Sequence, residues 1–108
     1  MLFTLQAKAA FVEGLEDIPL AEGLSLTENG SLSFGNEEIR LIERLLTSQT
    51  KNFQDVKKFY IETLPQMGWQ EKENLENKIS FEREGEVLEF NMESGKPLIV
   101  RLTVKSKN

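Results

Sequence analysis

Apolar residues recur at intervals of three and four between residues 52 and 67. This spacing places their side chains on one stripe of a helix. The residues of the stripe are Phe53, Val56, Phe59, Tyr60, Leu64 and Met67. Asn52 can cap the free amide groups at the start of such a helix, and Asp55 puts a negative charge in its first turn. We therefore predict a helix over residues 52–67.

After Trp69 the apolar residues alternate with polar ones, which is the pattern of half-buried strands. Three segments show it: "KISFERE", "EVLEFNME" and "PLIVRLTVK". Their alternating apolar residues are Ile79 and Phe81; Leu88, Phe90 and Met92; and Leu98, Val100, Leu102 and Val104. Gly85 and residues 94–96 supply turn residues between the segments. The pattern predicts a meander of antiparallel strands.

The stretch "LPQMGW" can be interpreted in two ways. In the structural interpretation, Gly68 adopts a left-handed backbone just past the helix, and the amide of Trp69 reaches back to the carbonyl of Leu64. Pro65 removes a hydrogen bond in the last turn and helps to end the helix. In the functional interpretation, Tyr60 and Trp69 clamp a ligand or supply a general acid. The structural interpretation explains more of these residues, so we predict a helix stop.

Residues 38–48, "EIRLIERLLTS", fit two kinds of element. Ile39, Ile42 and Leu45 can share a helical face, and propensity favours this helix, with Asn36 as its cap. Residues 39–45 also nearly alternate, as in a strand. Upstream, Asn29-Gly30 predicts a turn.

Residues 11–26 have no sustained period and contain two glycines and a proline, so we predict an extended arm that packs through Ile18, Leu20 and Leu24. The arm carries Glu13, Glu16 and Asp17, which lack the spacing of a calcium loop. We interpret these three residues as a partner-binding surface. Glu82, Glu84, Glu86 and Glu89 are expected on the solvent faces or turns of the meander.

The chain has 108 residues and a net charge of −5, with no cysteine and no histidine. This composition excludes cysteine nucleophiles, Ser-His-Asp relays and thiolate-bound zinc. The acidic balance disfavours nucleic-acid binding. We predict no catalytic residue, no metal site, no cofactor and no membrane span.

The N-terminus contains Ala7-Lys8-Ala9, a tripeptide of the kind at which secretory signals are cleaved. Residues 1–10 are therefore expected to be a signal-peptide remnant or a disordered N-terminus, and residues 11–108 a single α+β domain. The alternative is a cytoplasmic protein with a docking N-terminal segment.

Four segments, "EDIPLAEGL", "LSFGNEEIRLIE", "VKKFYIETLPQMGWQ" and "ISFEREGEVLEF", together resemble a small uncharacterised family of alphaproteobacterial proteins. Its members look like exported proteins with a "DIPLMPGL"-like arm and an "FYxxTLPxLGW" helix end. The resemblance covers most of the chain from Phe11 onward, and it departs at Ala21-Glu22, where the family pattern has Met-Pro. It implies that residues 38–48 form a strand, paired with "SLSF" through a turn at Gly35-Asn36, and that the protein is periplasmic or otherwise exported. It implies no activity.

The expected fold is α+β, a two-layer sandwich of one helix packed across an antiparallel sheet of about five or six strands. The leading functional hypothesis is a non-catalytic exported module that binds another envelope protein through the acidic arm or an open sheet edge.

The main alternative is a binder of a small apolar ligand, in a cavity lined by Phe59, Met67, Phe81, Phe90 and Met92. A cytosolic enzyme is disfavoured by the missing histidine and cysteine. An empty apolar cavity open to solvent favours the ligand, whereas a filled core with an exposed edge favours the partner.

Overall fold

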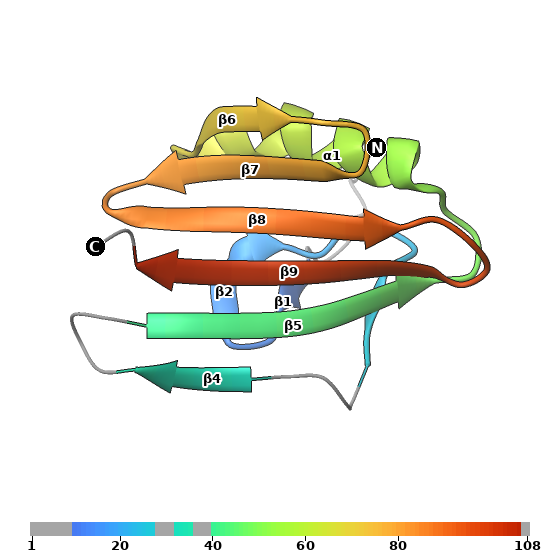
Figure 1. Cartoon of the computed structure of the whole chain (residues 1–108), viewed down its shortest axis with the longest axis horizontal. Coiled ribbons are helices and arrows are strands. Elements are labelled where there is room, and N and C mark those ends of the chain that lie inside the picture. The colour runs from blue at the N-terminus through green and yellow to red at the C-terminus, as the bar shows by residue number, and fades with distance from the viewer. Residues whose placement is uncertain (1–9, 28–31, 36–39, 107–108) are drawn as a thin grey trace, which may run out of the picture.

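The computed structural model describes residues 10–27, 32–35 and 40–106. These residues form an α+β fold with one α-helix and two antiparallel sheets (Figure 1). Within the described residues the larger sheet has seven strands in the order β3-β5-β9-β8-β7-β6, and β4 pairs with β5 beside β3. In chain order its strands are β3 (Ser25–Leu26), β4 (Leu32–Gly35), β5 (Arg40–Ser48), β6 (Gln70–Asn74), β7 (Lys78–Arg83), β8 (Glu86–Glu93) and β9 (Leu98–Ser106). The smaller sheet pairs β1 (Phe11–Val12) with β2 (Leu15–Pro19).

The predicted meander is confirmed as β7, β8 and β9. In the register, Phe81 lies opposite Leu88, and Leu88 lies opposite Val104. Cross-strand partners point to the same face of a sheet. The alternating apolar residues of all three strands are buried there, whereas Asn91 and Arg101 between them are exposed. One face of the sheet therefore holds the core and the other faces solvent. The edge strand β6 is entirely polar and exposed, so no apolar alternation could have predicted it.

Residues 40–48 form strand β5, so the helix favoured by propensity is wrong and the strand implied by the resemblance is confirmed. The strand pairs with β9 on one side and with β3 and β4 on the other. Ile42 and Leu46 face the core. Pairing with partners far along the chain outweighs the local helical preference. The Asn29-Gly30 turn, and Asn36 with its turn and capping roles, lie outside the described residues.

The predicted helix is confirmed as α1 (Phe53–Thr63), which continues into the 3₁₀-helix η1 (Leu64–Met67). The Asn52 side chain accepts the Asp55 N–H at 2.9 Å, and the Asp55 carboxylate accepts the Asn52 N–H at 3.1 Å. This reciprocal pair satisfies two amide groups that the helix leaves free. The 3₁₀-helix η1, which is wound more tightly than α1, begins at Leu64, next to Pro65.

The helix end is shaped by Gly68, whose φ is +93°. The Trp69 N–H donates to the Leu64 carbonyl at 3.2 Å, and the Gly68 N–H donates to the Pro65 carbonyl at 3.1 Å. These bonds satisfy carbonyl groups at the end of the helix and turn the chain into β6. Trp69 is thereby placed in the core, with 2% of its surface exposed.

Two segments cover the core face of the sheet. In Figure 1, α1 lies behind β6 and β7, and the β1–β2 hairpin lies behind β5 and β9. Val56, Tyr60 and Leu64 are the buried residues of the helix stripe. The Tyr60 ring packs on Phe90 of β8 with 4.3 Å between centroids. Helix and sheet thus share one apolar core.

Candidate functional site

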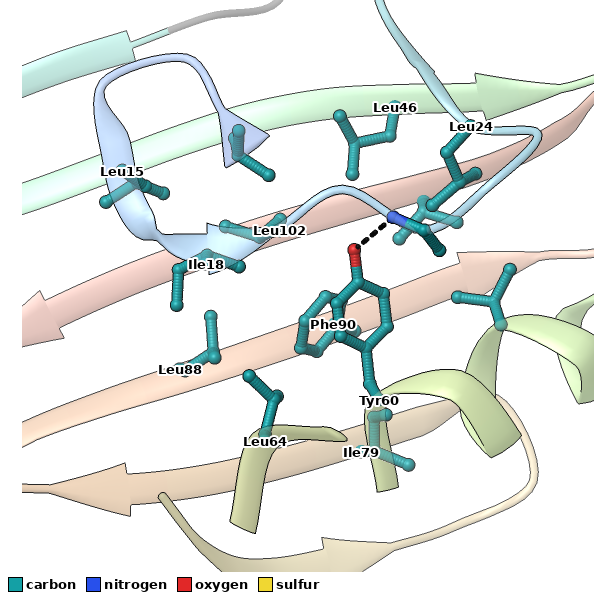
Figure 2. Close-up of a cluster of buried hydrophobic side chains, with 14 of the residues drawn as sticks. Leu15, Ile18, Leu24, Leu46, Tyr60, Leu64, Ile79, Leu88, Phe90 and Leu102 are labelled. Atoms are coloured by element: carbon teal, nitrogen blue, oxygen red, sulfur yellow. Dashed lines mark hydrogen bonds between the residues drawn. The ribbon is translucent and has the colours of Figure 1, made fainter. Parts of the chain in front are cut away.

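The Tyr60 hydroxyl fixes the N-terminal segment to α1. We call residues 10–24, which contain β1 and β2, the arm. The hydroxyl donates to the Pro19 carbonyl at 2.7 Å. It also accepts the Ala21 N–H at 3.2 Å, the bond drawn as a dashed line in Figure 2. Burial raises the pKa of Tyr60, although the Ala21 hydrogen bond acts in the opposite direction. Tyr60 therefore keeps the proton that it donates to Pro19.

Arg83 of β7 is a second attachment point for the arm. Its guanidinium pairs with the Asp17 carboxylate and donates to the Met67 carbonyl at 3.0 Å. The same group lies over the Trp69 ring, 4.3 Å from its centroid, within the range of a cation–π interaction. Arg83 thus joins the arm, the helix end and the buried tryptophan. The Trp69 Nε1–H is buried and finds no hydrogen-bond partner among the described residues.

Arg44 of β5 contacts the turn of the arm. Its Nε donates to the Glu13 carbonyl at 3.0 Å, and its Nη1 donates to the Glu43 carbonyl at 2.9 Å. Gly14 lies against the same guanidinium, since a Cβ there would be 2.5 Å from Nη2. Gly14 also has a φ of +83°, so the turn requires glycine for both space and backbone conformation.

The structure separates the three acidic residues of the arm that the sequence singled out. Asp17 is engaged by Arg83, whereas Glu13 and Glu16 are exposed. Val12 and Leu15 face each other across the hairpin and are both buried. Glu16 follows Leu15 and therefore points to the opposite, solvent side. No group of three or more metal-ligating side chains occurs in the described part of the chain.

The structure does not bring the five proposed ligand-binding residues together. Phe81 and Phe90 are fully buried, with ring centroids 6.3 Å apart. Phe59 lines a hollow of about 130 Å³ between the arm and α1. Met67 lines a hollow of about 460 Å³ beside Arg83, and Met92 lines hollows of about 400 and 180 Å³ at the opposite end of β8. None of these four hollows is lined by two of the five residues.

The solvent face of the sheet carries ion pairs. Glu89 lies 3.9 Å from Lys78 and 3.8 Å from Lys105. The hydrogen bond to Glu73 and the charge of Glu89 raise the pKa of Lys78. Exposed pairs of this kind contribute little stability.

Two further carboxylates of the meander also lie near bases. Glu86 accepts from Nη2 of Arg40 at 2.8 Å, and this pairing raises the pKa of Arg40. Glu82 lies 3.9 Å from Lys72. Glu84 lies in the turn to β8 and has a φ of +50°.

The two edges of the large sheet differ in chemistry. At one edge, β6 has the sequence QEKEN, every residue is exposed, and its register with β7 shifts between Glu71 and Glu73. At the other edge, β4 has the sequence LSFG and no charge. Among the described strands, β4 pairs only with β5. Charged residues and register shifts protect an edge from added strands, and only β6 has them.

The contacts of Arg44 and Arg83 with the arm could not be predicted from the sequence. Asp17 and Arg83 are 66 residues apart, and no local pattern marks either as a partner of the other. No helix in the described residues is both long and apolar enough to cross a membrane. Comparison of the chain with family models, curated proteins and solved structures returned no match.

Proposed function

We propose that this protein is a non-catalytic module that acts outside the cytoplasm and binds an extended segment of another protein. The segment adds to the large sheet as a further strand beside β4. Main-chain hydrogen bonds supply much of the affinity in this mode of recognition.

The observation that carries the proposal is the difference between the two sheet edges. The β6 edge has three charged residues and a register shift, which oppose strand addition. The β4 edge has neither, and Ser33 in its centre is exposed. On the other side of β4, the register runs from Leu32 opposite Glu43 to Gly35 opposite Arg40, so its inner side is already paired with β5. A partner strand would therefore pair with a strand that carries no charge and is already paired with β5 on its other side.

The packing of the core favours a protein partner over a small apolar ligand. Tyr60, Phe81 and Phe90, which lie between helix and sheet, each have 0% of their surface exposed. The residues proposed to line a ligand cavity are distributed among the core and separate hollows. A filled core, beside an edge strand that pairs only with β5 among the described strands, supports partner binding.

The proposed export rests on the tripeptide Ala7-Lys8-Ala9. Cleavage after Ala7-Lys8-Ala9 would leave Ala10 as the first residue. The Ala10 carbonyl accepts the Leu20 N–H at 2.9 Å, so a chain that begins at Ala10 would keep this contact.

We also propose the two-layer arrangement, with α1 and the arm as one layer and the large sheet as the other. The contact between Tyr60 of α1 and Phe90 of β8 supports it, together with the burial of Ile18 in the arm. This arrangement leaves the β4 edge uncovered by the described helix.

Site-specific photo-crosslinking in the native cells tests the proposal. A photoreactive residue at Ser33 is expected to capture a partner protein, whereas one at Glu71 on the β6 edge serves as the matched control. Binding of the identified partner should then weaken by roughly tenfold or more in Ser33→Lys, because a lysine on an edge opposes strand addition. Asn91→Lys on the exposed sheet face should leave it unchanged.

Equal capture from both edges, or capture from Glu71 alone, would contradict the assignment of the β4 edge. The mass of the mature protein tests export separately, since cleavage at the predicted site leaves a chain that begins at Ala10. A mature chain that retains residues 1–9 would contradict export.

A further inference from the structure

The arm is attached to the rest of the protein by polar contacts at three points along its length. Arg44 of β5 holds the Glu13 carbonyl, Arg83 of β7 holds the Asp17 carboxylate, and Tyr60 of α1 holds the backbone on both sides of residue 20. Each attachment comes from a side chain of the remaining fold. The main chain of the arm is therefore held by side chains rather than by a neighbouring strand.

The backbone-to-backbone hydrogen bonds described for the arm close within the arm itself. Among the described strands, β1 and β2 pair only with each other. The Leu20 N–H donates to the Ala10 carbonyl at 2.9 Å, and the Leu24 N–H donates to the Ala21 carbonyl at 3.1 Å. Pairing with the large sheet starts only at β3. Lifting the arm would therefore break no ladder hydrogen bond of the large sheet.

The apolar contacts of the arm are opposed by the entropy of ordering it. Its buried apolar residues are Val12, Leu15, Ile18, Ala21 and Leu24. Figure 2 shows Leu15, Ile18 and Leu24 lying over Leu46 of β5 and Leu102 of β9. Burial of these side chains favours docking, whereas release of residues 10–24 restores their backbone freedom. The balance of these two contributions decides how easily the arm opens.

We infer that the arm is a strap that opens as one unit while α1 and the large sheet remain folded. The chain pivots at Gly23, which has a φ of +89° and lies two residues before the pairing of β3 begins. Opening exposes the apolar side chains of β5 and β9 that the arm covers. Tyr60, through its hydrogen bonds to Pro19 and Ala21, is one of the contacts that hold the strap closed.

Native-state hydrogen exchange, followed by NMR on the full chain, tests this inference. The amides of Leu20 and Ala21 report on the arm, and those of β8 and β9 report on the sheet. Ile79→Val is the decisive variant, because Ile79 lies on β7, opposite Phe90, and is fully buried. It should accelerate sheet exchange by roughly two- to tenfold and leave the exchange of the Leu20 and Ala21 amides unchanged.

Tyr60→Phe is the complementary variant, because it removes these hydrogen bonds of Tyr60 to the arm and leaves the sheet intact. It should accelerate exchange of the arm amides by about tenfold or more. Exchange of the arm amides should also depend less steeply on denaturant than that of the sheet amides, because opening of the arm exposes less surface.

An equal effect of Ile79→Val on arm and sheet amides would overturn the inference, because the arm would then open only by global unfolding. Arm amides as strongly protected as those of β8 and β9 in the unaltered protein would overturn it too. Ile79→Val alone decides the question if Tyr60→Phe fails to fold.

Discussion

The Tyr60 hydroxyl donates a hydrogen bond of 2.7 Å to the carbonyl of Pro19, a residue 41 positions earlier in the chain. Pro19 belongs to "EDIPLAEGL" and Tyr60 to "VKKFYIETLPQMGWQ", two of the segments from which a family resemblance was predicted. Ala21, where the predicted family pattern has methionine, donates its N–H to the same hydroxyl. This contact uses only the backbone of Ala21, so a different side chain at that position is compatible with it.

Tyr60→Phe is expected to destabilise the protein by about 1–3 kcal/mol. The substitution keeps the ring but leaves the Pro19 carbonyl and the Ala21 N–H buried without their partner. Denaturant unfolding measures the effect. Ser33→Ala, which removes an exposed hydroxyl from β4, is the control and should change the free energy of unfolding by less than about 0.5 kcal/mol. Equal effects of the two substitutions would show that the buried hydroxyl contributes nothing specific.

Stability is expected to decrease as the pH rises above the ordinary tyrosine pKa of 10.0. Burial raises the pKa of Tyr60 in the folded state, so above pH 10 the unfolded state loses the phenolic proton first. The unfolded state then binds fewer protons than the folded state, and the free energy of unfolding falls with pH. Below the unfolded pKa this contribution to stability is fully present.

Because Tyr60 is the only tyrosine, the phenolate absorbance reports on this group alone. Titration of the folded protein should show ionisation well above pH 10, and the Tyr60→Phe variant should lose this part of the pH dependence of stability. Ionisation of the folded protein near pH 10 would contradict the buried, hydrogen-bonded hydroxyl.

Gly68→Ala is expected to cost roughly 1 kcal/mol or more, because φ at this position is +93°. The new Cβ would also lie 3.3 Å from Cδ of Arg83. Gly68→Asn is an informative comparison, because asparagine tolerates a left-handed backbone better than alanine does. If the backbone angle dominates, the larger asparagine should cost less in thermal or denaturant unfolding. A neutral alanine variant would refute this account of the helix end.

Glu84→Asn is expected to stabilise the protein by about 0.5–1 kcal/mol. Glu84 and Gly85 form the two-residue turn between β7 and β8 and have φ values of +50° and +83°. Two positive angles are typical of a type I′ turn, for which Asn-Gly is the preferred pair. Glu84→Gln removes the charge without improving the turn, so it should leave the denaturant midpoint nearly unchanged. If Glu84→Gln stabilised the protein as much as Glu84→Asn, removal of the charge rather than the turn would explain the effect.

Trp69→Ala is expected to destabilise the protein by about 3–5 kcal/mol, because it leaves a large cavity in the core. Trp69→Phe should cost much less, because it keeps an aromatic ring beneath Arg83 and removes the buried Nε1–H, which has no hydrogen-bond partner among the described residues. Denaturant unfolding followed by circular dichroism compares the two variants without relying on tryptophan fluorescence. A similar loss of stability in Trp69→Ala and Trp69→Phe would contradict this account of the Trp69 Nε1–H.

Local patterns predicted the elements whose interactions are mostly local or periodic. The helix stripe with its Asn52 cap, and the alternation of β7, β8 and β9, were identifiable because side-chain period directly reflects backbone conformation. The arm was predicted to be extended and partly packed, but its hairpin was not, because β1 is only two residues long. β6 was missed because an edge strand exposed on both sides needs no apolar alternation.

For this protein, the sequence by itself determined the helix, the meander and the turn residues that separate them. Only the tertiary structure decided that residues 40–48 are a strand, because β9, β3 and β4 supply the partners that outweigh helical propensity. It also decided that Arg83 binds Asp17 and that Tyr60 holds the arm. These contacts join residues 41 to 66 positions apart, and at such separations the partner is chosen by how the elements pack rather than by any pattern along the chain.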